Sequence, residues 1–191
     1  MIDTSKIQDG DRFLSAGTAW ISKQIIHYMT LYRDKFPVVN GVKNLLSGFV
    51  ASHCATFFWI DGVLYLYGSI DWGYKPIVFT DHYSENDSWI ILRTKDGYTD
   101  GQKKLALNYA MVSMGGSTIY PYWALPMWIL YVKTGWKWVL NGGGQKAQVC
   151  YKSVYQVLRQ IEPYKYSLNP LYVTFFDSIR SDDQIIIDNR K

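Results

Sequence analysis

Two apolar segments on either side of a turn dipeptide form the clearest pattern in the chain. Residues 51–60 and 63–67 are rich in aromatic and aliphatic side chains, and Asp61-Gly62 lies between them. Asp-Gly is preferred in two-residue type I′ turns, which need a positive φ at both positions. The pattern predicts a tight β-hairpin whose two segments pair residue by residue outward from the turn.

Alternation along this hairpin assigns its side chains to two faces. In a strand, successive side chains point to opposite sides of the sheet. His53 is therefore predicted opposite Ile70 on one face, with Cys54 on the other. The first face is expected to carry His53, Ala55, Phe57, Trp59, Leu64, Leu66 and Gly68, and the second Cys54, Thr56, Tyr65 and Tyr67.

Hydrophobic periodicity outside the hairpin predicts helices and further strands. Helices are expected over 18–32, over 100–114 with a stop at Gly115-Gly116, and from Cys150 onward. Strands are expected at 11–14 and 89–93, and a loop with a short turn at 37–48. Together these elements predict an α+β fold.

The composition suits one folded domain. The chain has 191 residues, of which 48% are hydrophobic and 17% aromatic, enough to bury a core without disulfide bonds. We predict a single domain over 1–191, with a core at about 8–162 and a C-terminal extension at 163–191. Two apolar runs in the extension, 172–176 and 185–187, are expected to add edge strands or to dock on a partner.

Charge and residue spacing argue against several classes of function. The net charge of +4 is small and the basic residues are scattered, so no nucleic-acid partner is expected. The three histidines and two cysteines show no metal-ligand spacing, so neither a metal nor another cofactor is predicted. Residues 1–8 lack the apolar region of a signal peptide, which favours a cytoplasmic or virion-associated protein over a secreted one.

One segment is unusually apolar. Residues 120–132 form an almost unbroken aromatic and aliphatic run that contains Pro126. The run is shorter than the ~20 residues of a membrane-spanning helix, so no transmembrane segment is predicted. One interpretation is a buried core helix broken at Pro126. The alternatives are a wall of the substrate cleft that includes Tyr120 and Trp123, an acyl-chain groove, or an assembly surface over 120–138.

Cys150 and His53 are the candidate catalytic pair. Cys150 begins the last predicted helix, whose apolar face continues through Val154 and Leu158, and it follows the glycine-rich segment 141–144. The positive end of a helix dipole and a nearby imidazole both favour a thiolate, the form of cysteine that attacks a carbonyl carbon. The alternative is that Cys150 and His53 are ordinary core residues.

The alternation of the hairpin also separates the two cysteines. Cys54 follows His53 directly, so its side chain should point to the opposite face and be unable to share a proton with the imidazole. We predict that Cys54 is an ordinary buried thiol and that only Cys150 is activated.

The order of several short segments resembles a known family. In chain order the segments are Asp9-Gly10-Asp11-Arg12-Phe13, Ser52-His53-Cys54-Ala55, Ile91-Leu92-Arg93, Gly116-Ser117-Thr118-Ile119-Tyr120 and Cys150-Tyr151-Lys152-Ser153-Val154. This order resembles the circularly permuted NlpC-type papain-like family, which includes the YiiX-like hydrolases and the lecithin retinol acyltransferase-like enzymes. The resemblance implies an antiparallel sheet packed against helices, with Cys150 as nucleophile and His53 as general base.

The chain departs from the family pattern near the histidine and after the cysteine. The family usually carries a polar or acidic residue on the strand after the histidine, where it orients the imidazole. Here that strand reads Leu64-Tyr65-Leu66-Tyr67-Gly68. Tyr67 is the third member by motif position, and Asp71 is the first carboxylate after the hairpin. Tyr151 stands where a serine usually follows the cysteine.

Two hypotheses about function follow. In the first, implied by the resemblance, the protein is a thiol hydrolase that acts on amide or ester bonds of a peptide or acyl substrate, with cell-wall peptide amides as the leading class. In the second, the protein is an inactive permuted papain-like scaffold or binding protein, such as a component of a phage virion. The missing acidic third member favours the second hypothesis, and the retained Cys150 and His53 favour the first.

Overall fold

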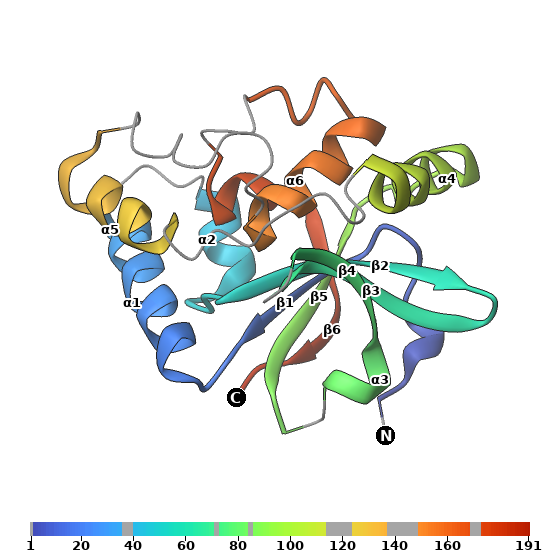
Figure 1. Ribbon diagram of the computed structural model, residues 1–191, viewed down its shortest axis with the longest axis horizontal. Helices are drawn as coiled ribbons and strands as arrows, with labels where there is room; N and C mark the ends of the chain where they lie inside the picture. The colour runs from blue at the N-terminus through green and yellow to red at the C-terminus, as the bar shows by residue number, and fades with distance from the viewer. Residues whose placement is uncertain are drawn as a thin grey trace.

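The strands form one antiparallel sheet with the N-terminal strand near its middle. A computed structural model describes residues 2–35, 40–70, 73–83, 86–113, 124–136, 149–168 and 173–191. The strands are β1 (Arg12–Ala16), β2 (His53–Ile60), β3 (Val63–Ile70), β4 (Gly73–Val78), β5 (Ser88–Thr94) and β6 (Asp183–Asn189). They form a six-stranded sheet in the order β4-β3-β2-β1-β5-β6, and every neighbouring pair is antiparallel (Figure 1).

The longer helices lie on one side of this sheet. The α-helices are α1 (Trp20–Lys35), α2 (Asn40–Leu46), α3 (Phe79–His82), α4 (Asp100–Asn108), α5 (Ala124–Thr134) and α6 (Cys150–Ile161). Short turns are the 3₁₀ helices η1 (Thr4–Lys6) and η5 (Phe175–Ser178) and the π-helical turn η2 (Tyr109–Ser113). Helix α6 packs on β2 and β3 and against α4, α1 lies along α5, and the short α3 packs on β3 and β4 from the opposite side (Figure 1). The predicted α+β fold with an antiparallel sheet against helices is confirmed.

The predicted hairpin is also confirmed. β2 pairs with β3 in a register that runs from Ile60↔Val63 to Thr56↔Tyr67. The turn residues Asp61 and Gly62 have φ values of 50° and 76°, as a type I′ turn requires. The two faces separate as alternation predicts: Ala55, Phe57, Leu64 and Leu66 pack in a small core with α3, whereas Cys54, Phe58 and Tyr67 pack in the larger core under α6.

Several element boundaries differ from the sequence predictions. β4 was not predicted, because Pro76 interrupts its apolar pattern; an edge strand tolerates a proline, whose missing N–H can face away from the ladder. The segment 37–48, predicted as a loop, contains the helix α2. The helix predicted over 100–114 keeps α geometry only to Asn108 and continues as the π turn η2.

The helix α5 accounts for part of the apolar segment 120–132. Pro126 was predicted to break this helix, and that prediction is wrong. The proline lies in the first turn of α5, where its missing N–H would have had no helical acceptor. Trp128 and Tyr131 are buried, and both rings pack on Tyr32 of α1, so this part of the segment is core. Among the described residues, no helix has the length and apolarity needed to cross a bilayer.

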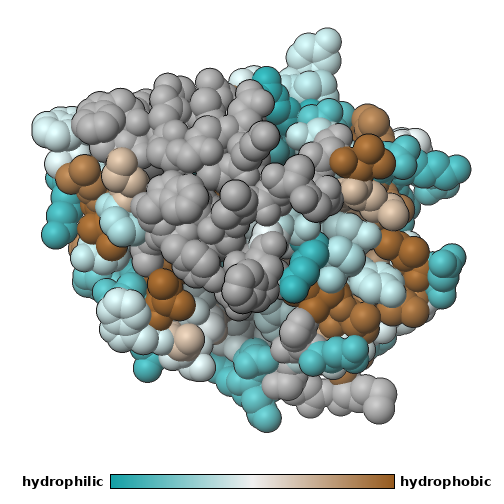
Figure 2. Space-filling model, in the orientation of Figure 1, coloured by the Kyte–Doolittle hydropathy of each residue, from teal (hydrophilic) through white to brown (hydrophobic). Residues whose placement is uncertain are grey.

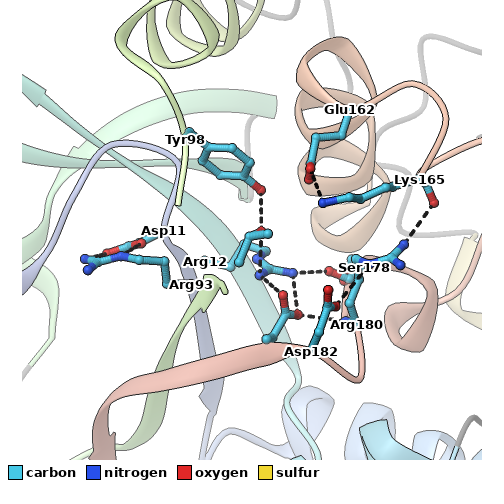
Figure 3. A network of polar contacts seen from close by, with 11 residues as sticks. Asp11, Arg12, Arg93, Tyr98, Glu162, Lys165, Ser178, Arg180 and Asp182 are labelled. Carbon is cyan, nitrogen blue, oxygen red and sulfur yellow. Dashed lines mark hydrogen bonds and ion pairs between the residues drawn. The ribbon is translucent and has the colours of Figure 1, made fainter. Parts of the chain in front are cut away.

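A buried ion pair joins the C-terminal strand to the centre of the sheet (Figure 3). Arg12 of β1 donates to both carboxylate oxygens of Asp183, at 2.7 and 2.5 Å, and to the carbonyl oxygen of Ser178 at 2.8 Å. The side chains of Arg12 and Asp183 are only 2% and 0% exposed. Because β6 also pairs with β5, residues 183–189 belong to the same sheet as the N-terminal strand.

A second ion pair explains two segments of the family resemblance. Arg93 of β5 donates to both carboxylate oxygens of Asp11, at 2.8 and 2.7 Å, and to the carbonyl oxygen of Lys6 at 2.7 Å (Figure 3). Asp11 in turn accepts from the backbone N–H of Gln8. The Gly-Asp segment and the strand ending in arginine therefore hold the N-terminal turn against the sheet.

Some hydrophobic side chains remain on the surface. Figure 2 shows them most densely on the side of the molecule that carries α4 and the β2–β3 hairpin. The exposed large hydrophobic residues there include Val63, Leu105, Met111 and Val112. Residues of this kind are common on protein surfaces and do not mark a binding site by themselves.

Candidate active site

Cys150 is the first residue of α6. Apolar side chains of this helix face the sheet, which brings its N-terminus over the start of β2. The sulfur is buried with the rest of Cys150, at 6% exposure, and lies 4.0 Å from the carbonyl oxygen of Ser52. The N-cap residue Val149 supplies no side-chain acceptor, so the first N–H groups of α6 have no capping partner from that residue. These groups and the helix dipole favour negative charge at the sulfur.

The structure brings His53, Cys54 and Cys150 together. His53 is the first residue of β2, directly opposite Ser15 of β1, and it is half-buried. Both the His53 ring and the Cys54 side chain hydrogen-bond to the sulfur of Cys150. The predicted pair is thus close in space, with a second thiol beside it.

These neighbours change the ionisation of Cys150. The pKa of its thiol is held well below the ordinary range by the hydrogen bond from Cys54, and then by the hydrogen bond and positive charge of His53. Burial acts in the opposite direction and is outweighed. The pKa of the Cys54 thiol is raised, because burial disfavours its anion and its proton is shared with Cys150. The two shifts give Cys150 the lower pKa of the pair and Cys54 the higher one.

The contact of Cys54 with Cys150 was not predicted, although burial raises the pKa of the Cys54 thiol, as expected for a buried cysteine. Its side chain does point to the helix-facing side of β2, as the alternation predicted. That side, however, is where the N-terminus of α6 lies, so Cys54 faces Cys150. Strand alternation predicts opposite faces for Cys54 and His53, yet at the start of β2, where α6 begins, both side chains act on the Cys150 sulfur.

One nitrogen of the His53 ring lacks a partner in the part of the chain that the structure describes. Its Nε2 atom is buried and has no hydrogen-bond partner there. Tyr67, predicted as third member by motif position, packs edge-on against Phe58 and beside Tyr74 on the helix-facing side of β3. Asp71, the other predicted third member, lies outside the described residues.

Ser15 and Tyr83 were not singled out from the sequence, although both lie near His53. Ser15 is directly opposite His53 in the sheet, and its side chain hydrogen-bonds to the hydroxyl of Tyr83. Burial is the largest cause that raises the pKa of Tyr83 to about 12, and the hydrogen bond with Ser15 acts in the opposite direction. Ser15 could have been found from the pairing of β1 with β2, whereas Tyr83 follows a short helix and carries no sequence signal.

Lys152 also lies in the first turn of α6. It is buried, and loss of hydration lowers its pKa to about 8. Nothing in the sequence singles out this lysine, since a lysine in a helix is most often exposed.

The other predicted site residues are not placed. Tyr120 and Trp123, the predicted cleft residues, lie outside the described residues. Within the described ranges, no group of three or more His, Cys, Asp and Glu side chains could hold a metal ion.

Comparison with known proteins identifies the fold. The chain is similar to the crystal structure of yiiX from Escherichia coli O157:H7, a protein described as a metalloprotein. The TM-score is 0.53 at 14% sequence identity, and the match covers 83% of this chain and 68% of that one. No protein-family model and no curated protein matches the sequence. The predicted permuted papain-like fold, the fold of yiiX, is thereby confirmed.

Proposed function

We propose that the protein is a thiol hydrolase in which Cys150 is the nucleophile and His53 the general base and acid. One observation carries the proposal. Cys150 lies at a helix N-terminus, and an imidazole and a second thiol form hydrogen bonds to its sulfur, so the pKa of its thiol is well below that of a free thiol. Such an environment is typical of reactive cysteines and rare for structural ones.

The proposed reaction has two steps. The Cys150 thiolate attacks the carbonyl carbon of an amide or ester, and His53 gives its proton to the leaving amine or alcohol. Backbone N–H groups of the first turn of α6 lie where they would stabilise the oxyanion. Neutral His53 then takes a proton from a water molecule, whose oxygen attacks the thioester carbonyl carbon. The carbon–sulfur bond breaks, the acid is released, and Cys150 leaves as the thiolate beside protonated His53.

Cell-wall peptide amides are the proposed substrate class. The support is the resemblance of the sequence to NlpC-type hydrolases, together with the fold. N-acyl and ester linkages are the second class, supported by the resemblance to acyltransferase-like members of the same family. Both classes present a carbonyl carbon to Cys150 and need no cofactor.

Incubation of the protein with purified peptidoglycan and with short acyl esters tests this proposal. Release of a free amine or acid, followed by mass spectrometry, is the measurement. We expect turnover by the wild-type protein and none above background by Cys150→Ala, because the nucleophile is lost. A matched control, Cys54→Ser, should keep measurable turnover. Equal product formation by the wild type and Cys150→Ala would remove Cys150 from the mechanism.

A separate prediction concerns the residue that orients His53. β3 is antiparallel to β2, so the last residues of β3 lie at the same end of the sheet as the first residue of β2, His53. Asp71 follows β3 directly in the sequence. We expect Asp71→Asn to lower turnover by about 10- to 100-fold, as loss of an orienting partner typically does. Tyr67→Phe should change turnover less than about twofold, because the Tyr67 ring packs on the helix-facing side. The reverse ranking would identify Tyr67 as the orienting residue.

An inactive scaffold is the second candidate function. It is favoured by the buried Nε2 atom of His53, for which no partner is found among the described side chains. An imidazole that lacks an orienting partner is a weaker base. In a scaffold, Cys150 would still ionise readily, yet no peptide or ester would be hydrolysed.

A further inference from the structure

Ser52 lies where three segments of the fold meet. It is buried and directly precedes His53, the first residue of β2. Its backbone N–H donates to the carbonyl oxygen of Ser15 in β1, at 2.9 Å. Its own carbonyl oxygen accepts from the sulfur of Cys150, the first residue of α6, at 4.0 Å. One residue therefore contacts the end of β1 and the N-terminus of α6 and leads into β2.

The hydroxyl of Ser52 binds the chain at and just beyond the end of β1. Its oxygen accepts from the backbone N–H of Gly17 at 2.9 Å, and the hydroxyl donates to the carbonyl oxygen of Ser15 at 3.4 Å. One hydroxyl can serve both partners, because it has a donor and two acceptor positions. The side chain thus ties the segment after β1 to the start of β2. The proposed mechanism above gives Ser52 no role.

We infer that Ser52 is a positioning residue, which holds His53 and the Cys150 sulfur in place relative to each other through its hydroxyl and its carbonyl oxygen. The inference rests on the proposed function, since it concerns the same two residues. Ser52 itself takes no part in the making or breaking of bonds.

The physical reason is the position of His53 at a strand end. His53 begins β2, and its pairing with Ser15 is at the end of the register between β1 and β2. The ends of strands open more readily than their interiors unless further bonds hold them. The two side-chain bonds of Ser52 extend the attachment one residue beyond this pair. They therefore restrain the backbone from which the imidazole projects.

The close approach of the hydroxyl depends on a glycine. A Cβ carbon at residue 17 would lie 2.6 Å from Oγ of Ser22 and 3.4 Å from Oγ of Ser52. Gly17 avoids this crowding and leaves its N–H directed at Ser52. Loss of the Ser52 hydroxyl would remove the acceptor of that N–H but keep the backbone bond to Ser15. We therefore expect the strand end to loosen locally while the sheet remains folded.

Alkylation of Cys150 by iodoacetamide at pH 7 tests the inference without any substrate, with mass spectrometry of the Cys150 peptide as the measurement. In Ser52→Ala we expect the rate constant to fall by about 10-fold, because a displaced imidazole stabilises the thiolate less. Where hydrolysis is measured, kcat should fall by about 10- to 100-fold and KM should change by less than about twofold. Ser52→Thr, which keeps the hydroxyl, should restore most of both losses.

Ser178→Ala is the matched control. The Ser178 hydroxyl is also buried and donates to the carbonyl oxygen of Phe175 at 2.7 Å within η5. Both alanine variants lose a buried hydroxyl, so their melting temperatures should fall by similar amounts. Alkylation of Cys150 in Ser178→Ala should stay within about twofold of the wild-type rate.

Three outcomes would overturn the inference: an unchanged alkylation rate in Ser52→Ala, an equal fall in Ser178→Ala, or a fall in Ser52→Thr as large as in Ser52→Ala. If Ser52→Ala does not fold, amide hydrogen exchange of the wild-type protein decides. We expect the Gly17 N–H to exchange at least about 10-fold more slowly than in an unstructured peptide. Exchange at the peptide rate would show that the hydroxyl does not hold this segment.

The alkylation assay also separates this inference from the proposed function. Slower alkylation in Ser52→Ala, in a protein that hydrolyses nothing, would support the role of Ser52 and overturn the hydrolase proposal. Hydrolysis that is lost in Cys150→Ala but unaffected by Ser52→Ala would do the opposite.

Discussion

Replacing Asp183 with alanine is expected to lower the free energy of unfolding by about 3–5 kcal/mol, the usual cost of leaving one partner of a buried ion pair alone. Asp183 accepts two hydrogen bonds from Arg12 and one from the backbone N–H of Arg180 at 2.7 Å. Without this carboxylate, the guanidinium of Arg12 would stay buried, and its acceptors among the described residues would be the Ser178 carbonyl oxygen and the more distant Thr94 hydroxyl. Urea unfolding followed by tryptophan fluorescence measures the change.

Asp188 provides the matched control on the same strand. Its carboxylate pairs with Arg190, and both side chains are partly exposed, at 42% and 25%. Exposed pairs contribute about 0.2–1 kcal/mol, so Asp188→Ala should change the free energy of unfolding by no more than that. A loss of similar size in both variants would mean that β6 tolerates no substitution, and that the buried pair is not the cause.

A double substitution separates the pair from its surroundings. Arg12→Leu combined with Asp183→Leu removes both charges and leaves apolar side chains of similar bulk in the core. Replacing a buried ion pair in this way is often close to neutral. The double variant should therefore be more stable than Asp183→Ala, because it leaves no uncompensated charge.

The hairpin is the part of the fold that local sequence determines. Asp61-Gly62 fixes the turn, the turn fixes the register, and the register fixes which side chains share a face. All of these relations act over a few residues, so they could be read before any tertiary contact was known. β4 could not be predicted in this way, because Pro76 and Lys75 interrupt the apolar pattern of a strand. This edge strand depends on its pairing with β3.

The candidate site was predictable only in part. The ordered segments with Ser52-His53 and Cys150 pointed to two residues that the structure brings together, because their chemistry is visible in the residue types. The contact between Cys54 and Cys150 was not predictable, since it depends on which side of the sheet α6 covers. The same limit applies to the pairing of Arg12 with Asp183, which lie at opposite ends of the chain.

Substitution of His53 by alanine is expected to lower turnover by about 10²- to 10⁴-fold, the usual contribution of a general base and acid. The reason is that the leaving group would depart without a proton and the water in the second step would attack without a base. Alkylation of Cys150 should slow by less, because Cys54 would still donate to the sulfur. The measurement is the initial rate of product release by the wild type and the variant under identical conditions.

His27→Ala is the control for this experiment. His27 lies on the exposed side of α1, where its ring contacts only Tyr28 among the ring pairs of the described residues. Its loss should leave turnover unchanged within about twofold, as for most surface substitutions. If His53→Ala and His27→Ala both retain wild-type turnover, His53 is not the base. In that case the proton must pass through another group near Cys150, and Lys152, whose pKa of about 8 lets it act as base or acid near neutral pH, would be the next residue to replace.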